Sequence, residues 1–104
     1  MKTPKVVTPV AEGINRRFFV GLEAVIGLGR VSSLEAFCKE FELTPSRYRE
    51  TRSTYGVTPN QNAAPSRYKT IDCEALHGLC SKYGVSAEWL LLGRGKMLKN
   101  EANR

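Results

Sequence analysis

The 104-residue chain has few of the residues from which catalytic and covalent sites are built: three cysteines, one tryptophan and one histidine. Three cysteines cannot all pair within one chain, so we do not expect a secreted fold held by disulfides. A histidine-based triad would require every other member to converge on His77. No pair of carboxylates and no glycine-rich phosphate loop stands out either. We therefore expect a reduced, cytoplasmic protein that is not an enzyme and has no cofactor.

Long apolar runs are also lacking. The most apolar stretch, residues 18–28, is too short to span a membrane and carries Glu23. Prolines interrupt the first 13 residues, which have no continuous apolar segment, so we expect neither a membrane anchor nor a signal peptide. With 41% hydrophobic and 25% charged residues, the composition suits one small globular domain.

Positive charge is plentiful and unevenly placed. Sixteen Lys and Arg against ten Asp and Glu give a net charge of +6. Residues 44–69 hold five of these cations against Glu50 alone, a local excess of four, with tyrosines and serines between them. Arginines beside hydroxyl groups suit phosphate oxygens and sugar edges. The simpler alternative is a solvated basic face that has no partner.

Hydrophobic periodicity predicts five short helices and no convincing strand, which is an all-α fold. The expected helices cover residues 14 to about 27, 32–41, 45–53, 72–83 and 87–92. Their expected N-caps are Ser32 (in a capping box with Glu35), Thr44, Asp72 and Ser86. We expect a flexible arm over residues 1–12, a compact domain over 13–98 and a tail over 99–104.

The segment from Ser32 to Ser53 is a short helix, a tight turn and a second short helix rich in arginine. In a helix-turn-helix the first helix braces the second, which lies in the major groove of DNA. Cys38 is small enough for the crossing of the two helices. Tyr48 and either Thr51 or Arg52 are expected on the inner side of the second helix.

Two motifs resemble the phage-repressor-like (Cro-type, lambda-repressor-like) helix-turn-helix family. The first is F-C-K-E-F-E-L-T-P-S-R-Y at residues 37–48, and the more specific one is G-V-S-A-E-W-L-L-L-G-R-G-K-M-L at 84–98. The resemblance implies a non-catalytic bacterial or phage transcriptional regulator that binds double-stranded DNA, in some members as a homodimer. The family usually has glycine where this chain has Glu42, and glutamine where it has Pro45.

The resemblance places the recognition helix at about residues 44–53 and implies contacts to DNA from it and from the following loop. The expected DNA-binding residues are Thr44, Pro45, Ser46, Arg47, Arg49, Glu50, Arg52, Arg67 and Lys69. Arg47 and Arg49 are the candidates for guanine, and Thr44, Ser46, Arg52, Arg67 and Lys69 are the candidates for phosphate.

Two alternatives remain open. The chain could be a protein-interaction module that keeps the helix-turn-helix fold without reading DNA, which Leu34, Pro45 and the long loop favour. Cys73, His77 and Cys80, spaced i, i+4 and i+7, could form a zinc site. Because no close C-x2-4-C pair accompanies them, we expect packing residues there instead, with no metal and no small-molecule ligand.

Overall fold

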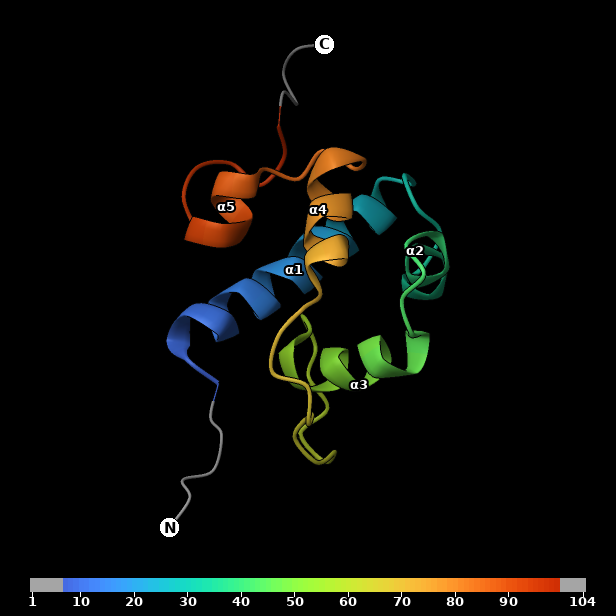
Figure 1. Ribbon diagram of the computed structural model, residues 1–104, viewed down its shortest axis with the longest axis vertical. Coiled ribbons are helices and arrows are strands. Elements are labelled where there is room, and N and C mark those ends of the chain that lie inside the picture. Colours follow the sequence, from blue (N-terminus) through green and yellow to red (C-terminus); the bar gives the residue numbers. More distant parts are fainter. Residues whose placement is uncertain (1–6, 100–104) are drawn as a thin grey trace.

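The computed structural model describes residues 7–99 and confirms an all-α architecture (Figure 1). Its helices are α1 (Pro9–Gly27), α2 (Leu34–Glu40), α3 (Pro45–Tyr55), α4 (Cys73–Ser81) and α5 (Ala87–Leu92). Between residues 7 and 99 the strand-type pairing amounts to a single isolated bridge, Val85 to Leu98. Residues 1–6 of the expected arm and 100–104 of the expected tail lie outside the described residues.

The long helix α1 organises the fold. It crosses the molecule and packs against α3, α4 and α5, while α2 packs on α3. Phe18 is fully buried, and its ring meets Phe19 edge-on at 5.0 Å and Phe37 of α2 at 5.8 Å between centroids. Tyr48 of α3 lies 6.0 Å from the same ring. One aromatic cluster therefore joins three helices, which leaves the opposite side of α3 facing outward.

Helix α1 begins earlier than predicted. The Thr8 hydroxyl accepts a hydrogen bond from the Ala11 amide at 3.1 Å, and Pro9 occupies the first turn. Threonine followed by proline is a favourable helix start because the hydroxyl caps an amide and proline lacks the N–H that would go unused. Residues 9–12, which were expected in the arm, are therefore helical.

The start of α2 also differs from the prediction by one residue. Ser33 occupies the N-cap, and its hydroxyl accepts from the Ala36 amide at 3.0 Å. The expected capping box of Ser32 with Glu35 is wrong. Starting one residue later places Leu34 at the first helical position, where it is buried in the core.

Of the two C-terminal helices, α5 follows the prediction, whereas α4 ends at Ser81, two residues before the predicted limit. Helix α5 has the predicted limits, and its Ser86 cap accepts from the Trp89 amide at 3.2 Å. Of its three leucines only Leu90 is buried, whereas Leu91 and Leu92 are 44% and 59% exposed. Helix packing alone decides this, since consecutive leucines point to different sides of one short helix.

The three cysteines have different surroundings. Cys38 is buried, Cys80 is half-buried and Cys73 is exposed. His77 is exposed too, so the expectation of packing residues at positions 73, 77 and 80 is wrong for Cys73 and His77. No group of side chains within residues 7–99 could hold a metal ion. Over the same stretch, none of the helices combines the length and the apolar character needed to cross a membrane.

Thiol labelling should separate these cysteines. Burial raises the pKa of Cys38 to about 11 and also raises the pKa of Cys80, so little reactive thiolate forms at neutral pH. We expect an electrophilic thiol reagent at pH 7.5 to label Cys73 first and Cys80 more slowly. Cys38 should react only after unfolding, as peptide mass spectrometry over a time course would show. Equal rates at Cys38 and Cys73 would contradict the described packing.

Candidate nucleic-acid interface

A tight turn joins α2 to α3. The Leu43 amide donates to the Cys38 carbonyl at 2.7 Å, and Glu42 has a φ of 59°. This left-handed conformation favours glycine because a side chain crowds the backbone there. The turn therefore keeps the backbone shape for which the resembling family usually uses glycine, although this chain places a glutamate in it.

Tyr48 fixes how α3 is rotated. Its side chain is buried, and its hydroxyl donates to the Asp72 carboxylate at 2.6 Å while accepting from the Asp72 amide at 3.1 Å. Burial raises the pKa of Tyr48 above its ordinary range, so the hydroxyl keeps its proton. Thr51 is also buried, which confirms Tyr48 and Thr51 as the inner side of α3. Arg52, the alternative to Thr51, is half-exposed instead.

The outer side of α3 carries the predicted site residues of its first turn. Thr44 and Ser46 are exposed, and Pro45 begins the helix. Thr44 occupies the N-cap as predicted, but no side-chain hydrogen bond caps the helix there. The first turn itself contains no acidic residue, although Glu42, Asp72 and Glu74 line the same surface pocket as Thr44.

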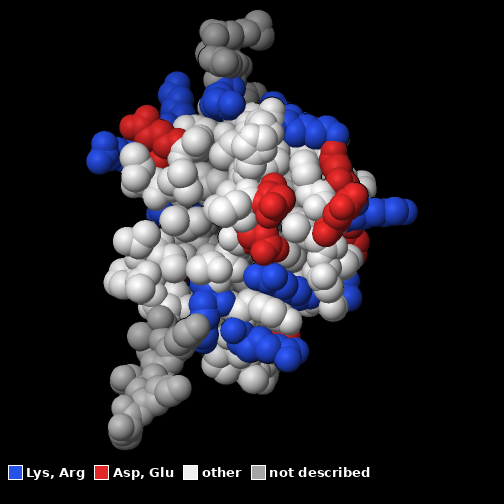
Figure 2. Space-filling model, in the orientation of Figure 1, with Lys and Arg blue, Asp and Glu red and all other residues white. Residues whose placement is uncertain are grey.

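The arginines of residues 44–69 do not form an isolated basic patch, because each lies beside a carboxylate. The N to O distances are 3.4 Å for Arg47 with Asp72, 3.1 Å for Arg49 with Glu35, 3.9 Å for Arg52 with Glu23 and 3.3 Å for Arg67 with Glu50. On the face shown in Figure 2, acidic side chains lie between groups of basic ones. The local excess of charge in the sequence is therefore largely balanced in the fold.

Arg47 is tied to the segment that follows α3. Its guanidinium lies over the Tyr68 ring, 4.7 Å from the centroid, and 5.9 Å from that of Tyr48. With the Asp72 ion pair, these contacts fasten the end of the loop to α3. Arg47, predicted as a candidate for guanine, thus has a role in holding the fold, and Arg49 is the more accessible of the two.

The loop does fold back onto α3, as the prediction for Arg67 and Lys69 required. The Glu50 carboxylate accepts from the Arg67 amide at 3.1 Å and from its guanidinium, whose side chain is 76% exposed. The backbone carbonyl of Lys69 accepts from the side-chain amide of Asn15 at 2.9 Å, which ties this part of the loop to α1. The structure thus brings Glu50 and Arg67 together beside α3 and anchors the backbone at Lys69 to α1.

Sequence reasoning missed the acidic partners of these arginines. Glu23 and Glu35 come from α1 and α2. Asp72 occupies the predicted N-cap of α4, but its carboxylate meets Tyr48 and Arg47 and makes no cap hydrogen bond. No local spacing rule links residues so far apart in the chain. The one available signal was the predicted position of Tyr48 on the inner side of its helix, because a buried hydroxyl needs a hydrogen-bond partner.

A scan against protein-family models found no match to this chain, and searches of the curated proteins and of the solved structures found none either. Function is therefore inferred from the geometry of α3 and its surroundings.

The Glu42 turn offers a stability test. We expect Glu42→Gly to raise the free energy of unfolding by about 0.5–1 kcal/mol, measured by urea denaturation, because relief of the left-handed strain exceeds the entropy that glycine adds to the unfolded chain. Glu42→Ala removes the same carboxylate but keeps a Cβ, so it should give no such gain. A similar gain in both variants would assign the effect to charge instead of backbone conformation.

The contact between Glu50 and Arg67 should appear in a pH titration. The Arg67 amide, followed by its guanidinium, holds the pKa of Glu50 below the ordinary 4.5. A lowered carboxylate pKa stabilises the fold above the ordinary pKa, and this stabilisation is lost as pH falls. We expect carboxyl-carbon NMR of Arg67→Gln to show the pKa of Glu50 rising only part of the way, since the amide remains. A full return to 4.5 would mean that the guanidinium acts alone.

Proposed function

We propose that the protein is a sequence-specific DNA-binding transcriptional regulator, with α2 and α3 as a lambda-repressor-like helix-turn-helix and α3 as the recognition helix. The observation that carries the proposal is the presentation of α3. The tight turn with left-handed Glu42 precedes the 11-residue helix α3. Tyr48 fixes the inner side of this helix, and the exposed hydroxyl residues Thr44 and Ser46 lie at its start. A helix with this exposure fits the major groove.

The outward residues of α3 divide into two kinds of contact. Thr44, Ser46 and the unpaired amides of the first turn suit phosphate oxygens, because a helix N-terminus favours negative charge. Arg49, with its side chain 49% exposed, can reach guanine O6 and N7 at a specific site, a contact of about 1–3 kcal/mol in discrimination, and a phosphate of the DNA backbone elsewhere. Arg67, exposed beside α3, supplies a further cation for the DNA backbone.

The ion pairs of these arginines are compatible with DNA binding. An exposed pair contributes at most about 1 kcal/mol, so a phosphate or a guanine edge can replace Glu35 beside Arg49 at small cost. When DNA binds, the Arg49 guanidinium exchanges the Glu35 carboxylate for a DNA group, so Glu35 competes with DNA for Arg49.

The same pairing supports a second candidate function, a protein-interaction module with this fold that does not read DNA. Four of the five cations of residues 44–69 already have carboxylate partners, which weakens the field that attracts nucleic acid. The exposed Leu91 and Leu92 offer apolar surface for a protein partner. In the regulator proposal the same surface would serve a homodimer on paired half-sites in a bacterial or phage-infected cytoplasm.

Fluorescence anisotropy with a random-sequence duplex across a salt series tests the proposal. We expect affinity to fall steeply with salt. A random-sequence duplex offers no guanine at a fixed position, so Arg49 meets a backbone phosphate there, and Arg49→Gln should weaken binding several-fold and lower the salt slope by about 1. Glu35→Gln should strengthen binding a few-fold, because it removes the competing carboxylate. Arg47 is left intact in these variants, since it also fastens the loop.

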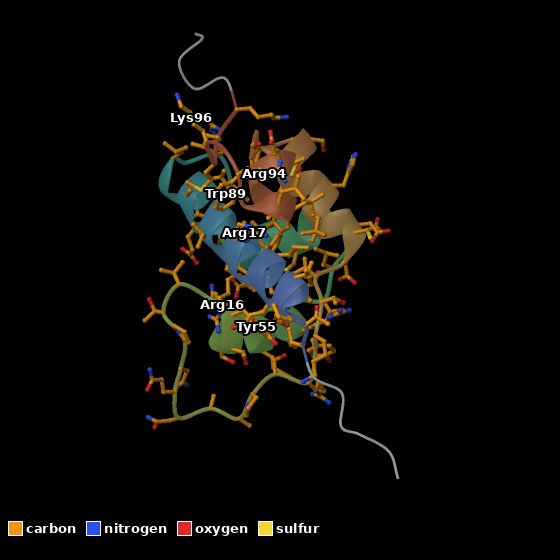
Figure 3. The ribbon with its side chains drawn as sticks, turned by 90° about the vertical axis from the view of Figure 1, so that its left-hand side faces the viewer. Arg16, Arg17, Tyr55, Trp89, Arg94 and Lys96 are labelled. Atoms are coloured by element: carbon orange, nitrogen blue, oxygen red, sulfur yellow. The ribbon has the colours of Figure 1, made fainter. Side chains whose placement is uncertain are left out.

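Arg94→Gln is the matched control. Arg94 is exposed and lies toward the end of the molecule opposite Tyr55, the last residue of α3 (Figure 3). The Arg94→Gln variant should bind DNA with the same affinity and salt slope as the wild type. No binding by folded protein at low salt, or equal losses in Arg49→Gln and Arg94→Gln, would contradict the assignment of DNA to α3.

A further inference from the structure

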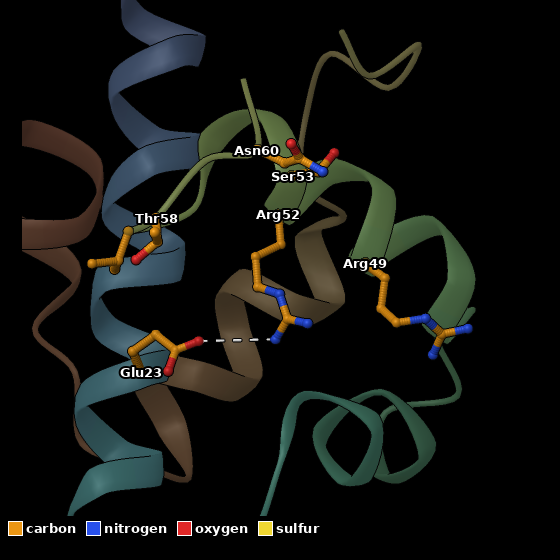
Figure 4. Close-up of a pocket in the computed structure, with 7 residues that line it drawn as sticks. Glu23, Arg49, Arg52, Ser53, Thr58 and Asn60 are labelled. Carbon is orange, nitrogen blue, oxygen red and sulfur yellow. Dashed lines mark ion pairs between the residues drawn. The ribbon is translucent and has the colours of Figure 1, made fainter. Parts of the chain in front are cut away.

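A pocket of about 430 Å³ lies beside α3, between α1 and the chain that leaves α3 (Figure 4). Its polar lining consists of Glu23, Arg49, Arg52, Ser53, Thr58 and Asn60. These residues come from three segments of the chain, and none was singled out as a small-ligand site from the sequence.

Two guanidinium groups dominate the pocket. Arg49 and Arg52 are three residues apart on α3, so they project from neighbouring turns of one helix face. The contact between Arg52 and Glu23 is long, at 3.9 Å, and the Arg52 side chain is 39% exposed. Arg49 gives one of its nitrogen atoms to Glu35 at 3.1 Å. Both guanidinium groups therefore keep N–H donors that can bind a ligand.

The chain after α3 adds neutral donors. The Asn60 amide donates to the Ser53 carbonyl at 2.9 Å, which holds the loop against the end of α3. The side-chain oxygen of Asn60 accepts from the Asn62 amide at 3.0 Å, so its NH₂ group is the end that remains to donate. The Thr58 hydroxyl lies on the α1 side of the opening (Figure 4). Ser53 has its hydroxyl proton directed to the Glu50 carbonyl.

We propose that this pocket binds a phosphate group, with Arg49 and Arg52 as its cationic donors and Thr58 and Asn60 as its neutral ones. A phosphate carries several strong acceptor oxygens, which can meet guanidinium forks on one side and hydroxyl or amide donors on another. The pocket deepens the proposed function where the phosphate belongs to the DNA backbone beside α3. A small phosphomonoester carries the same chemistry.

Glu23 sets the affinity of this site. Its carboxylate holds Arg52 at the opening and competes with an incoming phosphate for the same guanidinium. The two substitutions on this ion pair should therefore act in opposite directions, Arg52→Gln weakening phosphate binding and Glu23→Gln strengthening it. A purely structural ion pair would make both variants less stable and would change phosphate affinity in neither.

Arginine side-chain NMR of the full-length chain tests the proposal, with inorganic phosphate in one arm and random-sequence duplex in the other, at matched ionic strength. We expect saturable shifts of the Arg52 Nε–H signal in the phosphate arm. Glu23→Gln should tighten the apparent Kd several-fold, Arg52→Gln should weaken it at least several-fold at the Arg49 signal, and Arg94→Gln should leave it unchanged. Non-saturable phosphate shifts shared by all arginines would overturn the site.

The two arms separate this inference from the proposed function. Saturable phosphate binding without duplex binding would keep the pocket, assign it to a small phosphorylated ligand and reject the regulator. Duplex binding with a salt slope that is unchanged for Arg52→Gln in the anisotropy series, and no saturable phosphate shift, would reject the pocket and keep the regulator. Duplex binding with a slope reduced by about 1 in that variant would assign the pocket to the DNA backbone.

Discussion

The buried hydroxyl of Tyr48 is the constraint on which the arrangement of α3 depends. A buried hydroxyl without a partner would cost about 1–3 kcal/mol, and here it both donates to and accepts from Asp72. Because its ring also packs near Phe18, α3 has one favourable rotation relative to α1 and α4. The polar outer side of α3 is a consequence of that rotation. The proposed DNA contacts and the phosphate pocket both lie on surfaces that it orients.

A second consequence concerns charge. The fold that buries Tyr48 also carries Glu23, Glu35 and Asp72 to the arginines on α3. The field around α3 is therefore weaker than its sequence charge indicates, and an anionic ligand must compete with carboxylates already in place. This competition makes the affinity for an anionic ligand sensitive to single acidic residues, because replacing an exposed ion pair costs little free energy.

Much of the fold followed from periodicity and helix caps. The number of helices, the limits of α5, its Ser86 cap and the inward placement of Tyr48 and Thr51 were predicted from local patterns. The errors lie where local signals compete. Thr8 and Pro9 start α1 inside a segment without apolar period, and Ser33 caps α2 in place of the adjacent Ser32. Two adjacent residues with similar N-cap propensity cannot be told apart locally. Which of them caps the helix depends on which apolar residue that choice buries in the core.

The sequence by itself determined the all-α class, the positions of the helices and the supply of arginines on α3, because these depend on contacts within a few residues. Tertiary structure alone decided which carboxylates meet those arginines and that the Asp72 carboxylate meets Tyr48 and makes no cap hydrogen bond to α4. It also placed the loop beyond α3 beside Arg49 and Arg52, where it forms one side of their pocket. Such pairings join residues from different elements, and their energies are set by burial and geometry that no local pattern encodes.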